Sequence, residues 1–193
     1  ASEYIVPFGT PHDSDRGAIA EGGGAILLES LDSALERQAH ILGEIEDVSF
    51  SFHSDNFRGL DKHLQGPRMA LTPFKEKRID SLYLPITGSY IIDPSLYHAC
   101  GHFFPQHHAF SAEPIVGHTG AATALLNTVL ALKSLANQTL LPTLNYDENR
   151  LDPECRLIPS TEIITDRQVN RILLFSAGWG GYNGGCLVKK YEP

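Results

Sequence analysis

Two segments of the sequence place polar groups where they could act on a carbonyl. His118 precedes a long apolar segment, and an imidazole can donate or accept a proton during a reaction. Residues 178–185 are dense in glycine and lie between the apolar runs 171–177 and 186–188. Glycines allow positive φ and leave backbone N–H donors uncovered. An imidazole and bare N–H donors are parts of an acyl-transfer site, in which such donors stabilise an oxyanion.

Each of the two segments also has a purely structural interpretation. His118 would then be a buried histidine at a helix end with a structural hydrogen bond. The glycine turn would simply join two strands as a hairpin. Both interpretations remain open on these residues alone.

Other chemistry has weaker support in the sequence. His98 and His102 share the four-residue spacing of some metal ligands, with Asp93 nearby, but no third ligand stands at a clear spacing. Cys100 lies between them without an ordered base, so we expect a buried thiol. Glycines 22–24 precede no Gly-Lys-Ser/Thr and lead into a predicted strand, which excludes a nucleotide loop. We therefore predict neither a metal site nor a cofactor.

Composition limits the class of protein. The chain has 193 residues, of which 42% are hydrophobic, enough for a real core. Its formal net charge of −8 argues against nucleic acid as a partner. No apolar run reaches the ~18 residues of a membrane span and no leader opens the chain, so we expect a soluble cytoplasmic protein. The chain opens on Ala1 and its only methionine is Met69, which favours an engineered fragment or a trimmed product. The odd number of cysteines favours reduced thiols.

Apolar periodicity predicts strands alternating with helices. We expect short strands at 25–28 and 81–86, a half-buried strand at 44–53 with Val48, Phe50 and Phe52 on one face, and a helix that includes Leu31, Ala34 and Leu35. Residues 55–77 are predicted to be rich in loops, with at most a short helix at 60–64. Asp93 is placed to cap a helix from Pro94.

The strongest predicted helix is 120–135, whose apolar residues occupy almost every face. A helix without a polar face must be covered on several sides. We therefore expect an α/β layered fold, a sheet flanked by helices, with more layers than this chain alone supplies.

Six segments in sequential order carry a resemblance. They are Asp15-Arg16-Gly17 with 21–29, residues 31–41, Thr87-Gly88-Ser89 with Asp93-Pro94, Gly117-His118 with 120–122, residues 142–145, and residues 178–183. Together they resemble the C-terminal part of the β-ketoacyl-acyl carrier protein synthases, the condensing enzymes of fatty acid and polyketide synthesis. The resemblance implies the thiolase-like fold, with residues 1–38 ending the N-terminal synthase half and 39–193 forming the C-terminal domain.

The resemblance also implies roles for particular residues. His118 matches the second of the two family histidines that promote decarboxylation of malonyl units. Trp179 matches the residue whose backbone N–H contributes to the oxyanion hole and whose ring gates the acyl pocket. Gly178, Gly180, Gly181 and Thr87 fall at positions around the substrate.

Three departures from the family pattern remove parts of its chemistry. The first histidine falls on Pro85, which has no proton to give. The lysine expected five residues before His118 falls on Glu113, which reverses the charge. The nucleophilic cysteine should precede Arg16, yet this chain has no cysteine before Cys100. Whether the chain is itself an enzyme therefore stays open.

These departures favour a degenerate synthase subunit or fragment of the chain-length-factor type, which shapes an acyl tunnel beside an active condensing enzyme. One alternative is the C-terminal part of an active 3-oxoacyl-acyl carrier protein synthase that performs a decarboxylative Claisen condensation. Another is a non-catalytic acyl-binding module. The expected partners are a synthase-like subunit or the missing N-terminal half, in a homo- or heterodimer. Acyl carrier protein is acidic, and a chain of charge −8 would meet it only indirectly.

Overall fold

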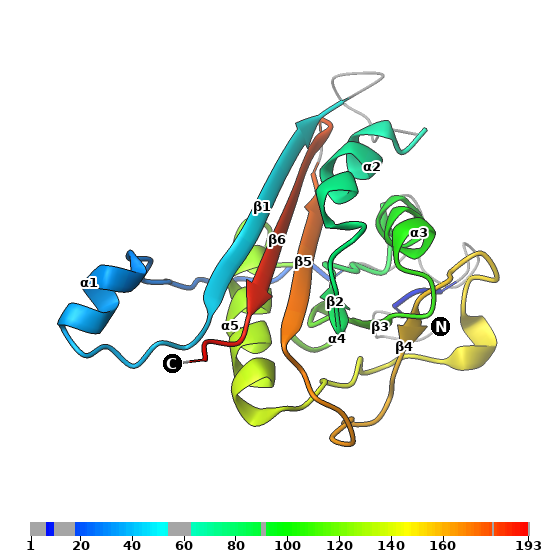
Figure 1. Cartoon of the computed structure of the whole chain (residues 1–193). Coiled ribbons are helices and arrows are strands. Elements are labelled where there is room, and N and C mark those ends of the chain that lie inside the picture. The colour runs from blue at the N-terminus through cyan, green and yellow to red at the C-terminus, as the bar shows by residue number, and fades with distance from the viewer. Residues whose placement is uncertain (1–6, 10–17, 54–62, 90–91, 179, 193) are drawn as a thin grey trace.

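The protein folds around one mixed sheet with helices on both faces (Figure 1). The computed structural model describes residues 7–9, 18–53, 63–89, 92–178 and 180–192. The sheet has six strands in the order β1-β6-β5-β2-β3-β4. The strands are β1 (Glu44–Phe52), β2 (Ser81–Tyr83), β3 (His108–Phe110), β4 (Ile158–Pro159), β5 (Arg171–Ala177) and β6 (Tyr182–Lys189).

Helices cover the two faces of the sheet and divide its core in two. The longest helix, α5, packs against one face, with Ala131 and Leu135 fully buried there. The α2 and α3 helices cover the other face, around Leu82, Leu173 and Leu187. The helical elements are α1 (Leu31–Glu36), α2 (Gln65–Leu71), η1 (Thr72–Phe74), α3 (Asp93–Phe103), α4 (Glu113–Val116), α5 (Ala122–Asn137) and η2 (Glu148–Arg150).

The parallel strands at the centre determine where the loops meet. The β2 strand pairs in parallel with both β3 and β5, while β6 is antiparallel to β5 and to β1. The segments that follow β2 and β3 carry Thr87 and Glu113. Because the carboxyl ends of parallel strands lie at one edge of a sheet, these segments are brought together there.

Several predicted elements are confirmed. The α/β architecture is present, as are the helix of Leu31–Glu36, the strand of Glu44–Phe52 and both strands that flank the glycine turn. The helix expected at 120–135 is found at Ala122–Asn137. The strand expected at 81–86 is shorter, Ser81–Tyr83, although Leu84 and Ile86 are still fully buried.

One predicted element is wrong. Residues 25–28 form no strand, and Leu27 and Leu28 are exposed, since no described segment pairs with them. The short helix expected at 60–64 falls mostly on residues 60–62, which lie outside the described residues. In the described part of the segment expected to be rich in loops, a helix spans Gln65–Leu71. Proline is tolerated in the first turn of a helix, so Pro67 does not prevent this helix.

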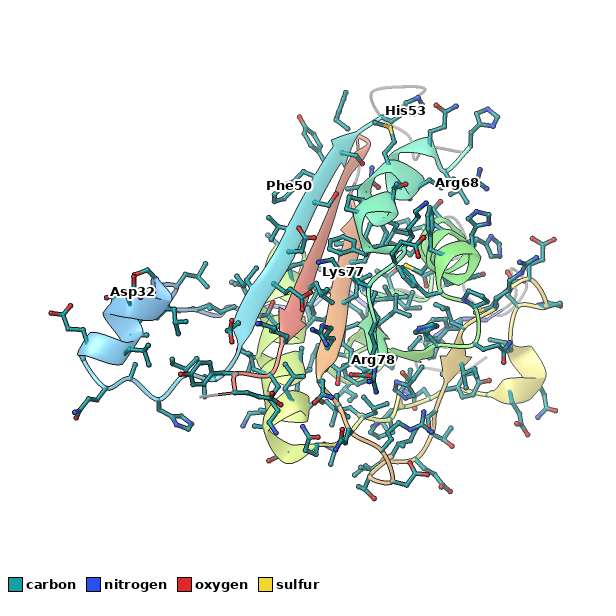
Figure 2. The ribbon with its side chains drawn as sticks, in the orientation of Figure 1. Asp32, Phe50, His53, Arg68, Lys77 and Arg78 are labelled. Atoms are coloured by element: carbon teal, nitrogen blue, oxygen red, sulfur yellow. The ribbon has the colours of Figure 1, made fainter. Side chains whose placement is uncertain are left out.

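The faces of β1 also differ from the expected pattern. Its apolar residues point outward and its serines inward: Phe50 is 83% exposed, whereas Ser49 is 9% exposed. The Ser51 hydroxyl donates to the Gly66 carbonyl oxygen on α2. Figure 2 shows Phe50 on the side of β1 away from α2. A strand whose apolar face is left uncovered has unused hydrophobic surface.

Among the described residues no helix is long and apolar enough to cross a membrane. Cys100, Cys155 and Cys186 are free thiols, as their odd number predicted.

Candidate functional site

His118 is fixed by backbone bonds to a segment far away in the sequence. Its N–H donates to the Ala18 carbonyl at 2.6 Å, and the Ala20 N–H donates to the His118 carbonyl at 3.0 Å. Gly117 permits this approach, with φ of 73° and ψ of 175°. A Cβ there would lie 2.8 Å from the Ala20 Cβ. Glycine is thus required for the histidine to be placed here.

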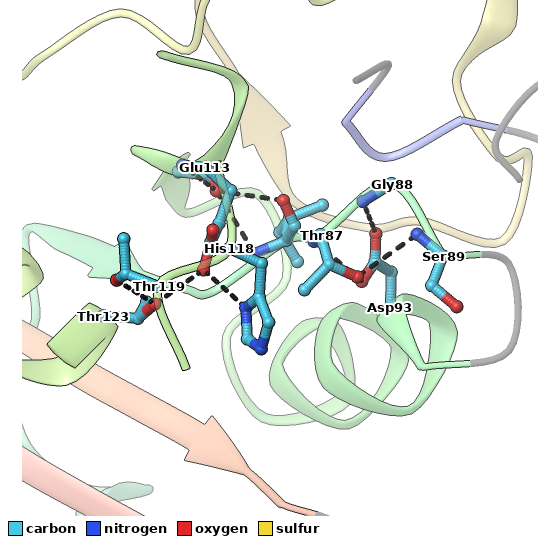
Figure 3. Close-up of polar contacts among 10 residues, drawn as sticks. Thr87, Gly88, Ser89, Asp93, Glu113, His118, Thr119 and Thr123 are labelled. Carbon is cyan, nitrogen blue, oxygen red and sulfur yellow. Dashed lines mark hydrogen bonds and ion pairs between the residues drawn. The ribbon is translucent and has the colours of Figure 1, made fainter. Parts of the chain in front are cut away.

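The His118 side chain belongs to a polar network with α4 and α5 (Figure 3). Its Nδ1 lies 3.2 Å from Glu113 Oε1, and the Thr123 hydroxyl donates to the same oxygen at 3.0 Å. Thr119 and Thr123 hydroxyl oxygens are 3.0 Å apart. Because a carboxylate can only accept, Nδ1 is the donor of the first bond when Glu113 is ionised.

Glu113 is an unusually placed carboxyl group. The residue is 1% exposed, and its Oε2 is buried with no hydrogen-bond partner among the described residues. Burial raises the pKa of Glu113, while the bonds from His118 and Thr123 act to lower it. An uncompensated buried oxygen of this kind is rare and commonly marks a functional position.

The Asp93 carboxylate binds the loop that follows β2, residues 84–89, which we call the Thr87 loop. Its Oδ1 accepts bonds from the Thr87 N–H and hydroxyl, each at 2.9 Å, and its Oδ2 accepts from the Gly88 N–H at 2.7 Å (Figure 3). The helix does begin at Asp93, but the carboxylate does not cap it as expected. Burial raises the pKa of Asp93 to about 7. Three hydrogen bonds to Asp93 therefore hold the Thr87 loop in place.

These elements line an open cavity of about 310 Å³, in which Gly120, Ala121 and Ala124 are exposed. It lies where α3, α5, the Thr87 loop and the end of β5 meet. It is lined by Pro85, Thr87, Ile92, Leu96, His118, Gly120, Ala121, Thr123, Ala124, Ser176, Ala177 and Gly178. The cavity is mostly apolar and its volume is at the lower end of the range for ligand sites. It suits a small apolar group beside one imidazole.

The residues predicted to act at the site are only partly brought together. His118, Thr87 and Gly178 line the same cavity. Gly180 and Gly181, with φ of 82° and 88°, form the turn between β5 and β6 and are not part of this lining. Trp179 lies outside the described residues. The catalytic and binding roles assigned to all of these residues stay predictions.

Two parts of the site, Thr123 and the role of Asp93, are not predicted by the sequence. Thr123 lies in a predicted helix whose apolar residues occupy almost every face, and its bond to Glu113 depends on tertiary structure. Asp93 was interpreted as a cap, because its bonds to the Thr87 loop depend on tertiary structure. Within the described residues no group of three His, Cys, Asp or Glu side chains is placed to hold a metal.

Curated proteins similar in sequence are condensing enzymes, while no protein-family profile matches the chain. The 3-oxoacyl-[acyl-carrier-protein] synthase 2 of Rhizobium meliloti is 25% identical, over 94% of this chain and 45% of its own. The 3-oxoacyl-[acyl-carrier-protein] synthase 1 of Escherichia coli K12 is 28% identical, over 90% of this chain and 43% of the length of that protein. A putative polyketide β-ketoacyl synthase 1 of Streptomyces halstedii is 25% identical, over 92% of this chain and 44% of the length of that protein. The chain spans less than half the length of each of these relatives.

Solved structures agree on the fold. The ishigamide ketosynthase/chain length factor matches with a TM-score of 0.85 and 23% identity, covering 100% of this chain and 48% of its own. A type II polyketide ketosynthase, solved with its acyl-carrier protein, matches with a TM-score of 0.85 and 21% identity. The match covers 98% of this chain and 48% of that chain. The resemblance to the C-terminal part of the β-ketoacyl synthases and the thiolase-like fold are thereby confirmed.

Proposed function

We propose that this chain, which has the fold of the C-terminal part of a ketosynthase, acts as a chain-length-factor-type partner of an active condensing enzyme. In this function it shapes a tunnel for the growing acyl chain and does not itself form the carbon–carbon bond. Residues 1–38 would end the N-terminal half of the synthase architecture and residues 39–193 would form the C-terminal domain. One structural neighbour is itself described as a ketosynthase/chain length factor.

The observation that carries this proposal is the composition of the cavity wall. Pro85, onto which the resemblance places the first family histidine, lines the cavity, and Glu113, onto which it places the lysine, contacts His118. None of the described lining residues is a cysteine. A condensation needs a nucleophile and polarised donors. This wall instead supplies mostly apolar surface, which suits an acyl chain.

The net charge of the chain supports a function in which a second protein binds the acyl carrier protein. The chain carries a net charge of −8, and an acyl carrier protein is also acidic, so like charges would slow their encounter. A more basic synthase partner would provide the docking surface for the carrier. The chain would then contact the carrier only through the complex, as one half of a dimer.

Reconstituting the chain with a candidate synthase partner tests this function. Ala124 lines the cavity, so Ala124→Trp should shorten the acyl products of the complex. Ala136→Trp is the matched control, because Ala136 is exposed on the same helix and does not line the cavity. An unchanged product length with Ala124→Trp, or failure of the chain to form any complex, would contradict the proposal.

The complex reconstituted with a synthase partner also distinguishes the proposed function from the alternative of an active synthase. If the chain itself condensed acyl units, His118→Ala would abolish malonyl decarboxylation by the assembled protein. Loss of a polarising donor costs such reactions about a hundredfold or more in rate. For a chain-length-factor-type subunit, decarboxylation should continue in the partner's active site with little change.

A further inference from the structure

No lysine or arginine is among the described residues that line the cavity containing His118. Two buried carboxyl groups stand directly behind its wall. Glu113 contacts His118 and Thr123, and Asp93 contacts Thr87. Three lining residues therefore have a carboxyl group as their hydrogen-bond partner.

We propose that this cavity binds an uncharged acyl group and rejects one that carries a carboxylate, and that Glu113 sets this preference. The proposal rests on the acyl-tunnel function above and specifies its ligand class. Glu113 acts here as a positioning and electrostatic residue, since it lies behind His118 and does not itself line the cavity.

The first argument is electrostatic. A ligand carboxylate next to His118 would lie near the fully buried Glu113 side chain, in surroundings where charges interact more strongly than in water. Either the two anions repel one another, or one of them must take up a proton, and both outcomes cost binding free energy. No lysine or arginine lines the cavity to offset that cost. An uncharged acyl group avoids it.

The second argument concerns the hydrogen bonds that His118 can offer. Its Nδ1 is already paired with Glu113, and Figure 3 shows Nε2 directed away from that carboxyl group. In an uncharged imidazole that donates through Nδ1, Nε2 is an acceptor. A carboxylate has only acceptor oxygens, so it gains nothing from such a nitrogen. In an imidazolium, the added charge would be offset by Glu113 itself.

Two thioesters of N-acetylcysteamine, isovaleryl and malonyl, provide a matched test. Their acyl groups have the same number of non-hydrogen atoms, and a branched pair of methyls in one replaces the carboxylate oxygens of the other. Ligand-observed NMR on the chain, in the assembly in which it purifies, would measure both affinities. We expect the isovaleryl probe to bind at least about tenfold more tightly than the malonyl probe.

Variants assign this preference to Glu113. Glu113→Gln keeps the shape and removes the charge, so the malonyl probe should gain at least about fivefold in affinity while the isovaleryl probe stays unchanged. Glu76→Gln is the control, because Glu76 is an exposed glutamate outside the cavity, and it should alter neither affinity. Thermal unfolding would establish that both variants are folded. The wild-type comparison stands even if Glu113→Gln does not fold.

The outcomes separate this proposal from the function on which it rests. Equal binding of the two probes to the wild-type protein would overturn the ligand preference and leave the acyl-tunnel function standing. A preference that persists in folded Glu113→Gln would overturn the role of Glu113. If neither probe binds any of the proteins, the acyl-tunnel function fails together with this proposal.

Discussion

Asp93 and Glu113 place two carboxyl groups behind one wall of the cavity, and each is held by donors from a different element. Asp93 accepts three bonds from Thr87 and Gly88, which favour its ionised form. Burial acts in the opposite direction and is the larger effect, so the pKa of Asp93 rises to about 7, with a contribution from Glu113. The support of the Thr87 loop is thus sensitive to pH.

Asp93→Asn should change how stability depends on pH. Because the folded pKa of Asp93 is raised from 3.8 to about 7, protonation of this group stabilises the fold at low pH, and this contribution is lost as the pH rises to 7. Asparagine does not titrate. Urea unfolding should therefore show a smaller loss of stability for the variant between about pH 4.5 and 7.5, by up to about 3 kcal/mol.

The asparagine amide would also meet the Gly88 N–H, a donor facing a donor. This costs about 1–3 kcal/mol at both pH values, so only the difference between the two measurements reports on titration. Asp166→Asn is the control, since the Asp166 side chain is 78% exposed. The same pH profile in wild-type protein and Asp93→Asn would contradict the raised pKa.

At the level of elements, the sequence predicted best where local chemistry and tertiary structure agree. Strands β5 and β6 flank a turn in which Gly180 and Gly181 have positive φ, and the apolar runs with glycines between them indicated this hairpin. The pattern at 25–28 resembles a strand too, but a strand needs a neighbour to bond with. Here the described chain offers none.

Parts of the site could be predicted from the family resemblance, and others could not. Glu113 and Pro85 were singled out because the resemblance places a lysine and a histidine at these positions. Their effect depends on which atoms they contact, which spacing does not reveal. The α2 helix was missed because Gly66 and Pro67 signal a loop, although proline is compatible with a first helical turn.

The connection between α4 and α5 can be tested through its glycines. Gly117→Ala should destabilise the protein by about 2 kcal/mol or more, because the backbone there adopts a conformation reserved for glycine and the new Cβ would be 2.8 Å from the Ala20 Cβ. Denaturant unfolding measures this cost. The exchange rate of the His118 amide should also rise, because the clash at residue 117 would weaken the neighbouring bond from His118 N–H to the Ala18 carbonyl.

Gly120→Ala measures the cost of a positive φ where a new Cβ makes no close contact. Gly120 has φ of 61°, yet nothing lies within 4 Å of a Cβ placed there. Left-handed backbone alone costs a residue other than glycine about 1–2 kcal/mol. Gly117→Ala should therefore be the more damaging of the two. Equal effects would show that the approach of Ala20 places no steric demand on residue 117.

At the level of the whole molecule, apolar residues of two elements are exposed to solvent. On α5, Val129 is exposed, whereas Ala131 and Leu135 are buried. On β1, Ser49 is buried and Phe50 is exposed. Val48 lies on the face of the sheet that α5 covers, since it pairs with Cys186, which packs with the α5 core. A further protein surface would cover this face.

We name the β1 patch as Val48, Phe50, Phe52 and Tyr182, four exposed residues of which Phe52 and Tyr182 have ring centroids 5.0 Å apart. Because exposed apolar patches promote association, the 193-residue chain purified alone should self-associate in sedimentation and bind a hydrophobic dye. Replacing Val48 and Phe50 together by threonine should weaken both effects, while the free energy of unfolding changes by less than about 0.5 kcal/mol, as for other exposed sites.

Met69→Gln is the control, because Met69 is an exposed apolar residue on α2, and it should alter neither self-association nor dye binding. A wild-type chain that stays monomeric and binds no dye would mean that this face needs no cover.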